Sequence, residues 1–227
     1  MRTPWLPALM VAAVPGITLA VPAESAEPFD TAEIYVEKNA TDDDTEVVIE
    51  AVGGDDGLCH FRVIAPGGRE VFRFDSTDRA SGGLREFLVE SPEPPGDAIL
   101  AAYPEGLYRF RGRTCDGQSF ASADWLSHRI PAATVIMWPP ADGEVDGTDG
   151  IVVEWSPVSG IDGYILELEN ESVDPEQSLT VNLPANTTRF RIPAHWIASG
   201  ADYQVGVATV ARDGNVVFAE IEFTTAD

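Results

Sequence analysis

The hydrophobic and polar positions of this chain follow the pattern of short β-strands. Apolar and polar residues alternate over short runs, and glycine, proline and aspartate separate the runs. In residues 163–169, for example, Tyr164, Leu166 and Leu168 share one face while Glu167 and Glu169 share the other. No long segment shows sustained helical periodicity. The pattern therefore predicts an all-β protein.

The first half of the chain is expected to contain seven strands and one short helix. The alternating runs predict strands near 32–37, 46–52, 58–64, 69–74, 84–90, 107–114 and 119–128. The stretch "APGGRE" predicts a hairpin turn at 65–70. The stretch "GDAILAAYP", residues 96–104, predicts a short helix at one end of the sandwich.

Prolines at 131, 139 and 140 flank a short apolar run, and we expect a domain boundary near residue 132. The predicted units are a signal peptide, 1–26, and two β-sandwiches, 27–131 and 132–227. Each sandwich has about 100 residues, which is the usual size of an immunoglobulin-like domain.

The N-terminus has the features of a cleaved secretory signal. Arg2 gives a short positive region, an apolar run follows, and small residues stand at Ala20, Ala23 and Ala26. The apolar run is too short to span a bilayer. We therefore expect a secreted or periplasmic protein without membrane insertion.

The second half resembles a fibronectin type III module over 134–225. The resemblance rests on an early Trp155, on Tyr164, on Ile197 placed six residues before Tyr203, and on a final strand that ends in Thr-Thr. It implies that Tyr203 forms a tyrosine corner, in which its hydroxyl satisfies backbone groups of the preceding turn. Tyr108, which follows "PEG", suggests a second corner in the first half.

A wider resemblance concerns the architecture and the cellular location of the protein. The stretches "IYVEKNATDDD", "YPEGLYRFRGRTCDG" and "DGNVVFAEIEF" are similar to uncharacterised exported bacterial proteins with a fibronectin-like C-terminal module. This resemblance implies an immunoglobulin-like sandwich over 27–131, a fibronectin type III-like sandwich over 132–227 and export, and it implies no activity.

The two cysteines, Cys59 and Cys115, are expected to form a disulfide. Exported proteins usually pair their cysteines. In an antiparallel sandwich, the strand that begins at Cys59 starts beside the end of the strand that precedes Cys115. Two buried thiols are the alternative.

The protein is strongly acidic, with a formal net charge of −24. Residues 27–131 carry 21 acidic and 10 basic residues, and residues 132–227 carry 16 and 3. Such a surface repels phosphate backbones and anionic lipids, so nucleic acid is excluded as a partner.

No catalytic constellation is evident in the sequence. His60, His128 and His195 lie near no nucleophile motif and show no metal-ligand spacing. Carboxylate pairs for glycoside hydrolysis need a deep cleft, which two small sandwiches seldom provide. We therefore expect no enzyme.

Arginines give the first candidate binding site. Arg109, Arg111 and Arg113 alternate along one strand and so share a face, which Arg62 and Arg73 are expected to join. Guanidinium groups bind carboxylate or sulfate. Cross-strand pairing with glutamate and aspartate is the alternative. Exposed tryptophans that stack on sugars form a further alternative, although we expect Trp138 to pack at the joint between the halves.

The acidic stretch "VEKNATDDDTEVV", residues 36–48, gives the second candidate. Its oxygen-bearing side chains suit calcium, which takes six to eight oxygen ligands. Lacking a glycine at the sharp turn, the stretch does not match an EF-hand. We interpret it as an acidic bend with a candidate calcium site, whose ligands would be Glu37, Asn39, Thr41, Asp42 and Asp44.

Together these features predict an exported, non-catalytic binding or adhesion-type protein that contacts a protein or a glycan at the cell envelope or outside. The alternatives are a small extracellular hydrolase that acts on a polymer and a structural spacer. The only cofactor considered is calcium.

Overall fold

The computed structural model describes residues 26–227, except 77, 79, 81, 174 and 176. The expected signal peptide, 1–26, lies outside the described residues except for Ala26. Nearly all of the secondary-structure elements are β-strands, which confirms the all-β prediction. No helix in the described part of the chain is both long and apolar enough to cross a membrane.

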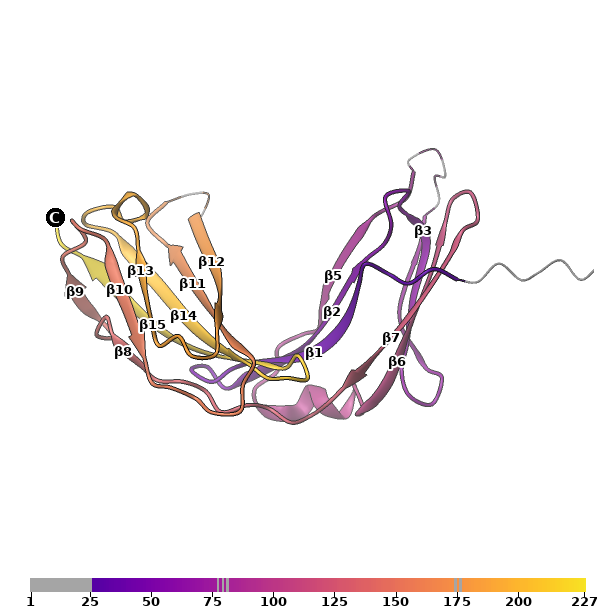
Figure 1. Cartoon of the computed structure of the whole chain (residues 1–227), viewed down its shortest axis with the longest axis horizontal. Helices are drawn as coiled ribbons and strands as arrows, with labels where there is room; N and C mark the ends of the chain where they lie inside the picture. Colours follow the sequence, from indigo (N-terminus) through magenta and orange to yellow (C-terminus); the bar gives the residue numbers. More distant parts are fainter. Residues whose placement is uncertain (1–25, 77, 79, 81, 174, 176) are drawn as a thin grey trace, which may run out of the picture.

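The first sandwich packs three strands against four (Figure 1). One layer has the order β1-β2-β5 and the other the order β4-β3-β6-β7. The 3-10 helix η2, Gly96–Ala101, lies where the sequence predicts a short helix. The strands are β1 (Thr31–Asn39), β2 (Asp44–Val52), β3 (Leu58–Ile64), β4 (Glu70–Asp75), β5 (Glu86–Glu90), β6 (Gly106–Thr114) and β7 (Ser119–Leu126).

The second sandwich repeats this arrangement with layers β13-β10-β8 and β12-β11-β14-β15. The short strand β9 pairs in parallel with the end of β15. The 3-10 helix η3, Ala194–Trp196, precedes β14. The strands are β8 (Ile136–Trp138), β9 (Gly143–Val145), β10 (Ile151–Trp155), β11 (Gly163–Asn170), β12 (Gln177–Pro184), β13 (Arg189–Ile192), β14 (Asp202–Val210) and β15 (Val216–Thr225).

Each sandwich has its own apolar core, built from the inward positions of alternating strands. The first core lies between Phe29 and Leu126 along the sequence and is rich in phenylalanine. The second lies between Val145 and Phe223 and centres on the fully buried Trp155. The structure thus confirms two tandem β-sandwiches of the immunoglobulin-like or fibronectin type III-like kind. It also contains the predicted disulfide between Cys59 and Cys115, whose Cα atoms lie 5.0 Å apart.

Both expected tyrosine corners are present. The fully buried Tyr203 hydroxyl accepts a hydrogen bond from the Ala198 backbone N–H at 2.7 Å and donates to the Trp196 carbonyl at 3.3 Å. In the first sandwich, the Tyr108 hydroxyl donates to the Pro104 carbonyl at 3.1 Å. Both tyrosines are therefore core residues that also satisfy backbone groups of the turn before their strand.

Replacing Tyr203 by phenylalanine should lower the free energy of unfolding by about 1.5 kcal/mol, because the Ala198 N–H and the buried Asn170 Nδ2 both lose their acceptor. Replacing Tyr108 by phenylalanine should cost less, because it leaves only a carbonyl without its donor. Urea unfolding of both variants measures the difference. Equal costs would show that ring packing, and not the hydrogen bonds, dominates both corners.

The two sandwiches are joined by a shared sheet, which local sequence patterns do not predict. Strand β1 of the first sandwich pairs in parallel with β15 of the second, from Glu37 opposite Val216 to Asn39 opposite Phe218. The order β12-β11-β14-β15-β1-β2-β5 therefore runs through both halves as one continuous sheet. Figure 1 shows the result, a bracket whose two arms rise from the β1–β15 junction.

Asn215 fixes this junction. Its side chain is fully buried. Its Oδ1 accepts from the Val36 backbone N–H at 2.8 Å, and its Nδ2 donates to the carbonyls of Ser127 and Arg129 at 2.9 and 3.0 Å. One side chain thus satisfies three backbone groups of the first sandwich and of the segment that follows it. This explains how a hairpin turn of the second sandwich holds the first in place.

Candidate functional site

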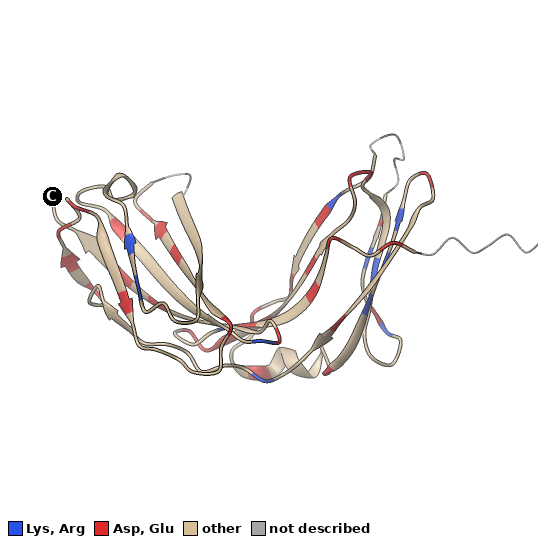
Figure 2. Cartoon of the chain, viewed as in Figure 1, with Lys and Arg blue, Asp and Glu red and all other residues tan. Residues whose placement is uncertain are grey.

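Five arginines share the solvent face of the β4-β3-β6-β7 layer, which we call the arginine face. Along β6 the residues alternate between buried Tyr108 and Phe110 and exposed arginines, so the arginines all point away from the core. The registers of β3 and β4 add two more arginines to the same face. Figure 2 shows basic residues along these outer strands of the first sandwich. The arginine face comprises Arg62, Arg73, Arg109, Arg111 and Arg113.

The cross-strand registers place like charges beside one another. Arg62 lies directly opposite Arg73 on β4 and directly opposite Arg111 on β6. Like charges in opposite positions destabilise a sheet. The three arginines form a row in a protein with a net charge of −24, so the sheet concentrates its scarce positive charge at this place.

Carboxylates neutralise only one side of the arginine face. Glu70 lies 3.8 Å from Arg62 and 4.0 Å from Arg73, and Asp75 also pairs with Arg73. All these contacts lie at the edge strand β4. On β6, Arg113 Nε donates to the Gly117 carbonyl at 3.2 Å and Arg111 donates to its neighbouring carbonyl at 3.5 Å.

The three arginines of β6 that the sequence predicts as ligand contacts have no acidic partner among the described residues. In the part of the chain that the structure describes, no carboxylate lies within 4.0 Å of the guanidinium groups of Arg109, Arg111 or Arg113. Their neighbours across the β6–β7 pair are Ala123, Ala121 and Ser119, which are small and uncharged.

A cavity of about 460 Å³ lies on this face. Ligand pockets for small molecules usually span roughly 300–1,000 Å³. Its lining combines three arginines and His60 with small residues of β7. The lining residues are Ala26, His60, Arg62, Arg111, Gly112, Arg113, Ser119, Phe120 and Ala121.

The three histidines lie in different parts of the fold and not in one cluster. His60 Nδ1 lies 2.7 Å from Asp75 Oδ1, and this hydrogen bond, followed by that of Arg73, holds the pKa of Asp75 below its usual value. His128 Nε2 contacts the Tyr103 carbonyl at 2.7 Å, and His195 lies in η3. Among the described residues, no serine or threonine hydroxyl is bonded to a histidine ring.

The candidate calcium ligands mostly serve the turn that contains them. Asn39 Oδ1 accepts from the Thr41 backbone N–H at 2.9 Å, and Asn39 Nδ2 donates to Asp42 at 3.2 Å. The Thr41 hydroxyl accepts from the Glu220 N–H at 2.9 Å. Asp44 begins β2 and Glu37 lies within β1. No three His, Cys, Asp or Glu side chains of the described residues are grouped as a metal site, and the calcium site stays a prediction.

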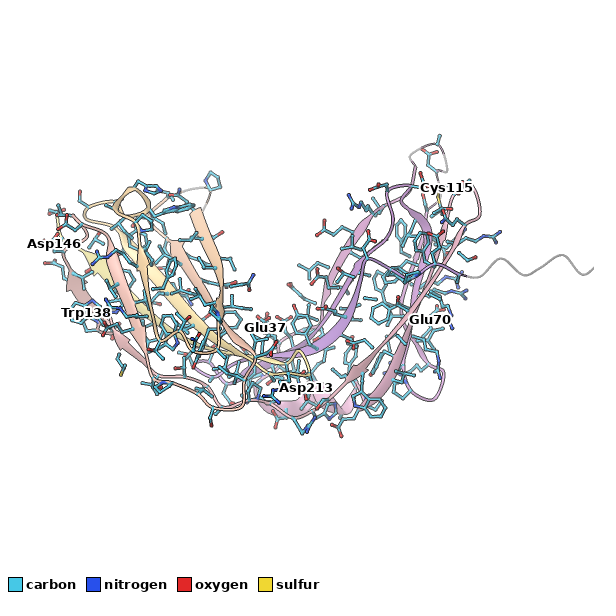
Figure 3. All side chains as sticks on the ribbon, viewed as in Figure 1. Glu37, Glu70, Cys115, Trp138, Asp146 and Asp213 are labelled. Carbon is cyan, nitrogen blue, oxygen red and sulfur yellow. A yellow bond between two sulfur atoms is a disulfide. The ribbon has the colours of Figure 1, made fainter. Side chains whose placement is uncertain are left out.

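The structure instead gathers acidic residues of different elements around a cavity of about 170 Å³, which we call the acidic pocket. Glu37 on β1 lies directly opposite Glu46 on β2, and Glu220 comes from β15 of the second sandwich. Figure 3 shows Glu37 at the base of the space between the two arms. The lining residues are Glu37, Asn39, Asp44, Glu46, Glu93, Phe218 and Glu220.

Burial and mutual repulsion make these carboxyls hold their protons more tightly than usual. Burial, followed by the Glu46 carboxylate, raises the pKa of Glu37 to about 7. Burial, followed by the carboxylates of Glu90 and Glu93, raises the pKa of Glu46 to about 7. Burial also raises the pKa of Glu220, although the Asn39 amide, which donates to it at 2.6 Å, opposes the effect.

Two of the tryptophans are exposed and lie far apart in the fold. Trp125 on β7 is 58% exposed and Trp138 on β8 is 47% exposed. The expectation that Trp138 packs at the joint is wrong. The Thr134 hydroxyl donates to the Ser156 carbonyl at 2.6 Å and so ties this segment to the second sandwich. Trp138 consequently lies opposite Glu154 on an edge strand, on the outer side of that sandwich (Figure 3).

Comparisons with known proteins show the following. No protein-family model and no curated protein sequence matches the chain. Among solved structures, the FN1–FN3 domains of chicken CNTN1 match with a TM-score of 0.32 and 11% identity, over 89% of this chain and 69% of that one. A segment of two fibronectin type III domains from chicken tenascin matches with a TM-score of 0.28 and 11% identity, over 86% of this chain and 97% of that one. Scores this low give no basis for carrying over a partner or a function.

Proposed function

We propose that the protein is an exported, non-catalytic binding protein that holds an anionic group of a protein or glycan on its arginine face. In this proposal, residues 27–131 form the binding module and residues 132–227 a second module locked to it by the shared sheet. The single observation that carries the proposal is the arginine face, on which three of the five arginines, Arg109, Arg111 and Arg113, have no carboxylate partner among the described residues.

The chemistry of the arginine face favours carboxylate or sulfate as the bound group. Guanidinium presents a planar fork of donors that matches such groups in a bidentate way. The net negative charge repels polyanions at long range, so binding requires local contacts with the arginines. Screening shortens the range of that repulsion to about 8 Å at physiological salt.

The export that we propose for this protein agrees with this role. The disulfide between Cys59 and Cys115 is of a kind that persists in oxidising compartments. The N-terminal segment has the composition of a signal peptide, and we propose the periplasm or the cell exterior as the location. A rigid bracket also suits a protein that presents a binding face at a fixed distance, which is the role of the spacer alternative.

The test is binding of the chain from residue 27 to heparin, which is sulfated, and to polygalacturonate, which carries carboxylates, with dextran as the uncharged control. Replacing Arg111 and Arg113 by alanine should weaken binding at least about tenfold, which corresponds to about 1.4 kcal/mol. The matched control replaces Arg189 and Arg191, which alternate in the same way on β13 of the second sandwich.

Calorimetry at two salt concentrations measures the affinity of each variant and the dependence of that affinity on salt. The control pair should leave the affinity within about twofold, and added salt should weaken binding of the unmodified chain. Equal losses in both double variants, or equal binding of dextran, would overturn the arginine face as the site.

A further inference from the structure

We propose that the acidic pocket receives the guanidinium group of an arginine side chain from a basic partner protein. This site differs from the arginine face in position and in charge. It therefore gives the protein a second contact, at the base of the bracket, for a partner of opposite chemistry.

The strongest evidence is the Glu46 carboxylate. Glu46 is only 8% exposed, and its Oε2 has no hydrogen-bond partner among the described residues. A buried acceptor without a donor carries a desolvation penalty, and a charged acceptor carries a larger one. Because Glu46 lines the acidic pocket, a donor that enters the pocket reaches it.

Among the residues that the structure describes, none supplies a cation to the acidic pocket. Its lining contains no lysine, arginine or histidine. The nearest basic residue along the chain, Lys38, follows Glu37 on β1 and so points to the opposite face of the sheet. The Lys38 ammonium lies 3.0 Å from Asp43 and 3.7 Å from Asp97, and so is already paired.

The spacing of the carboxylates favours a planar group with several donors over a bare ion. Glu220, Glu37 and Glu46 come from three strands that are neighbours in the order β15-β1-β2. Neighbouring strands lie about 4.8 Å apart, so the backbones of the outer two are separated by about 10 Å. A bare calcium ion needs all its oxygens within about 2.6 Å. A guanidinium group has five N–H donors in a fixed fork and can contact carboxylates on different sides.

The size and the lining of the pocket agree with a single side chain. At about 170 Å³ the cavity is smaller than the roughly 300 Å³ from which small-molecule pockets start. Phe218 contributes aromatic surface to the lining, against which an arginine stem or guanidinium plane can pack. The net charge of −24 attracts a basic partner at long range.

The test uses a neutral capped peptide that contains one arginine, titrated into the isotope-labelled chain from residue 27. NMR should show saturable shifts confined to the amides around the acidic pocket, such as those of Lys38, Val47 and Phe218. Replacing Glu37 and Glu46 together by glutamine should weaken binding at least about fivefold. The control Glu144→Gln plus Asp149→Asn removes the same charge from exposed positions of the second sandwich and should change it less than twofold.

Three outcomes would overturn the proposal. They are non-saturating shifts spread over the acidic surface, equal weakening in both double variants, and saturation of the same amides by calcium with no response to the peptide. The last outcome would assign the pocket to a metal ion. Because Glu37 and Glu46 lie outside the arginine face, heparin binding by their double variant tests the proposed function separately.

Discussion

Replacing Asn215 by alanine should lower the free energy of unfolding by about 3 kcal/mol and release the two sandwiches from their fixed arrangement. The variant leaves three backbone groups without their partner, namely the Val36 N–H and the carbonyls of Ser127 and Arg129. A buried polar group that loses its partner costs about 1–3 kcal/mol. Water that enters the junction should recover part of this loss.

The change in shape distinguishes Asn215 from an ordinary buried residue. The shared sheet depends on a short parallel pairing of β1 with β15, which Asn215 adjoins in sequence. Once the Val36 N–H has lost its acceptor, we expect this pairing to open and the arms of the bracket to move independently. Small-angle scattering should then show a broader distribution of interatomic distances, and urea unfolding should show two transitions.

The control is Asn182→Ala, since Asn182 is exposed on β12 and contributes to no junction. It should leave both measurements unchanged. An Asn215→Ala variant with native scattering and a stability within about 0.5 kcal/mol of the unmodified chain would contradict the role assigned to this side chain.

The second large effect is an unusual pH dependence, in which the protein becomes more stable as the solution is acidified from pH 8 to pH 5. In the folded protein the pKa values of Glu37 and Glu46 are raised to about 7, whereas the ordinary value is 4.5. Between these values the folded state binds more protons than the unfolded state. Stability therefore rises as the pH falls through 7, and the gain is complete near 4.5.

The size of the effect follows from the coupling of the two carboxyls. One pKa unit corresponds to about 1.4 kcal/mol. Because the two groups titrate together and Glu37 keeps some contact with solvent, we expect a gain on the order of 2 kcal/mol for the pair. This corresponds to a rise in melting temperature of roughly 4–8 °C. The charged groups that face the pair are Asp44, Glu90, Glu93, Glu167 and Glu220.

Melting curves at pH 8, 7, 6 and 5 measure this effect. The Glu37→Gln plus Glu46→Gln variant should be more stable than the unmodified chain at pH 8 and should lose most of the pH dependence. The Glu144→Gln plus Asp149→Asn control should keep it. Below about pH 4 the trend should reverse, because Asp75, Asp116 and Asp146 have lowered pKa values and lose stabilising contacts on protonation. A stability that falls steadily from pH 8 to pH 5 would refute the assignment.

Local patterns were sufficient for much of the fold and for one candidate site. The alternation of Tyr108 and Phe110 with Arg109, Arg111 and Arg113 assigns the arginines to the solvent face of a strand, because side chains in a strand alternate between two faces. Both tyrosine corners and the Cys59–Cys115 disulfide could also be predicted from the sequence, since each depends on neighbours within one sandwich.

Only half of the acidic pocket could be predicted from the sequence. Glu37 and Glu46 flank a tight turn, so the hairpin register alone brings them opposite each other. The strands predicted near 32–37 and 46–52 include both residues, whereas Asp44, which was interpreted as part of the bend, belongs to β2. Glu220 and Phe218 come from about 180 residues further along the chain, and no local signal connects them with β1.

By itself, the sequence determined which residues form strands and which face of each strand is polar, because both follow from a two-residue period that repeats along the chain. Only the tertiary structure decided that β1 pairs with β15, that Asn215 serves the first sandwich and not merely its own turn, and that Glu46 is buried. These facts depend on how one sheet edge meets another, and backbone hydrogen bonds between edges carry no side-chain pattern that identifies the partner.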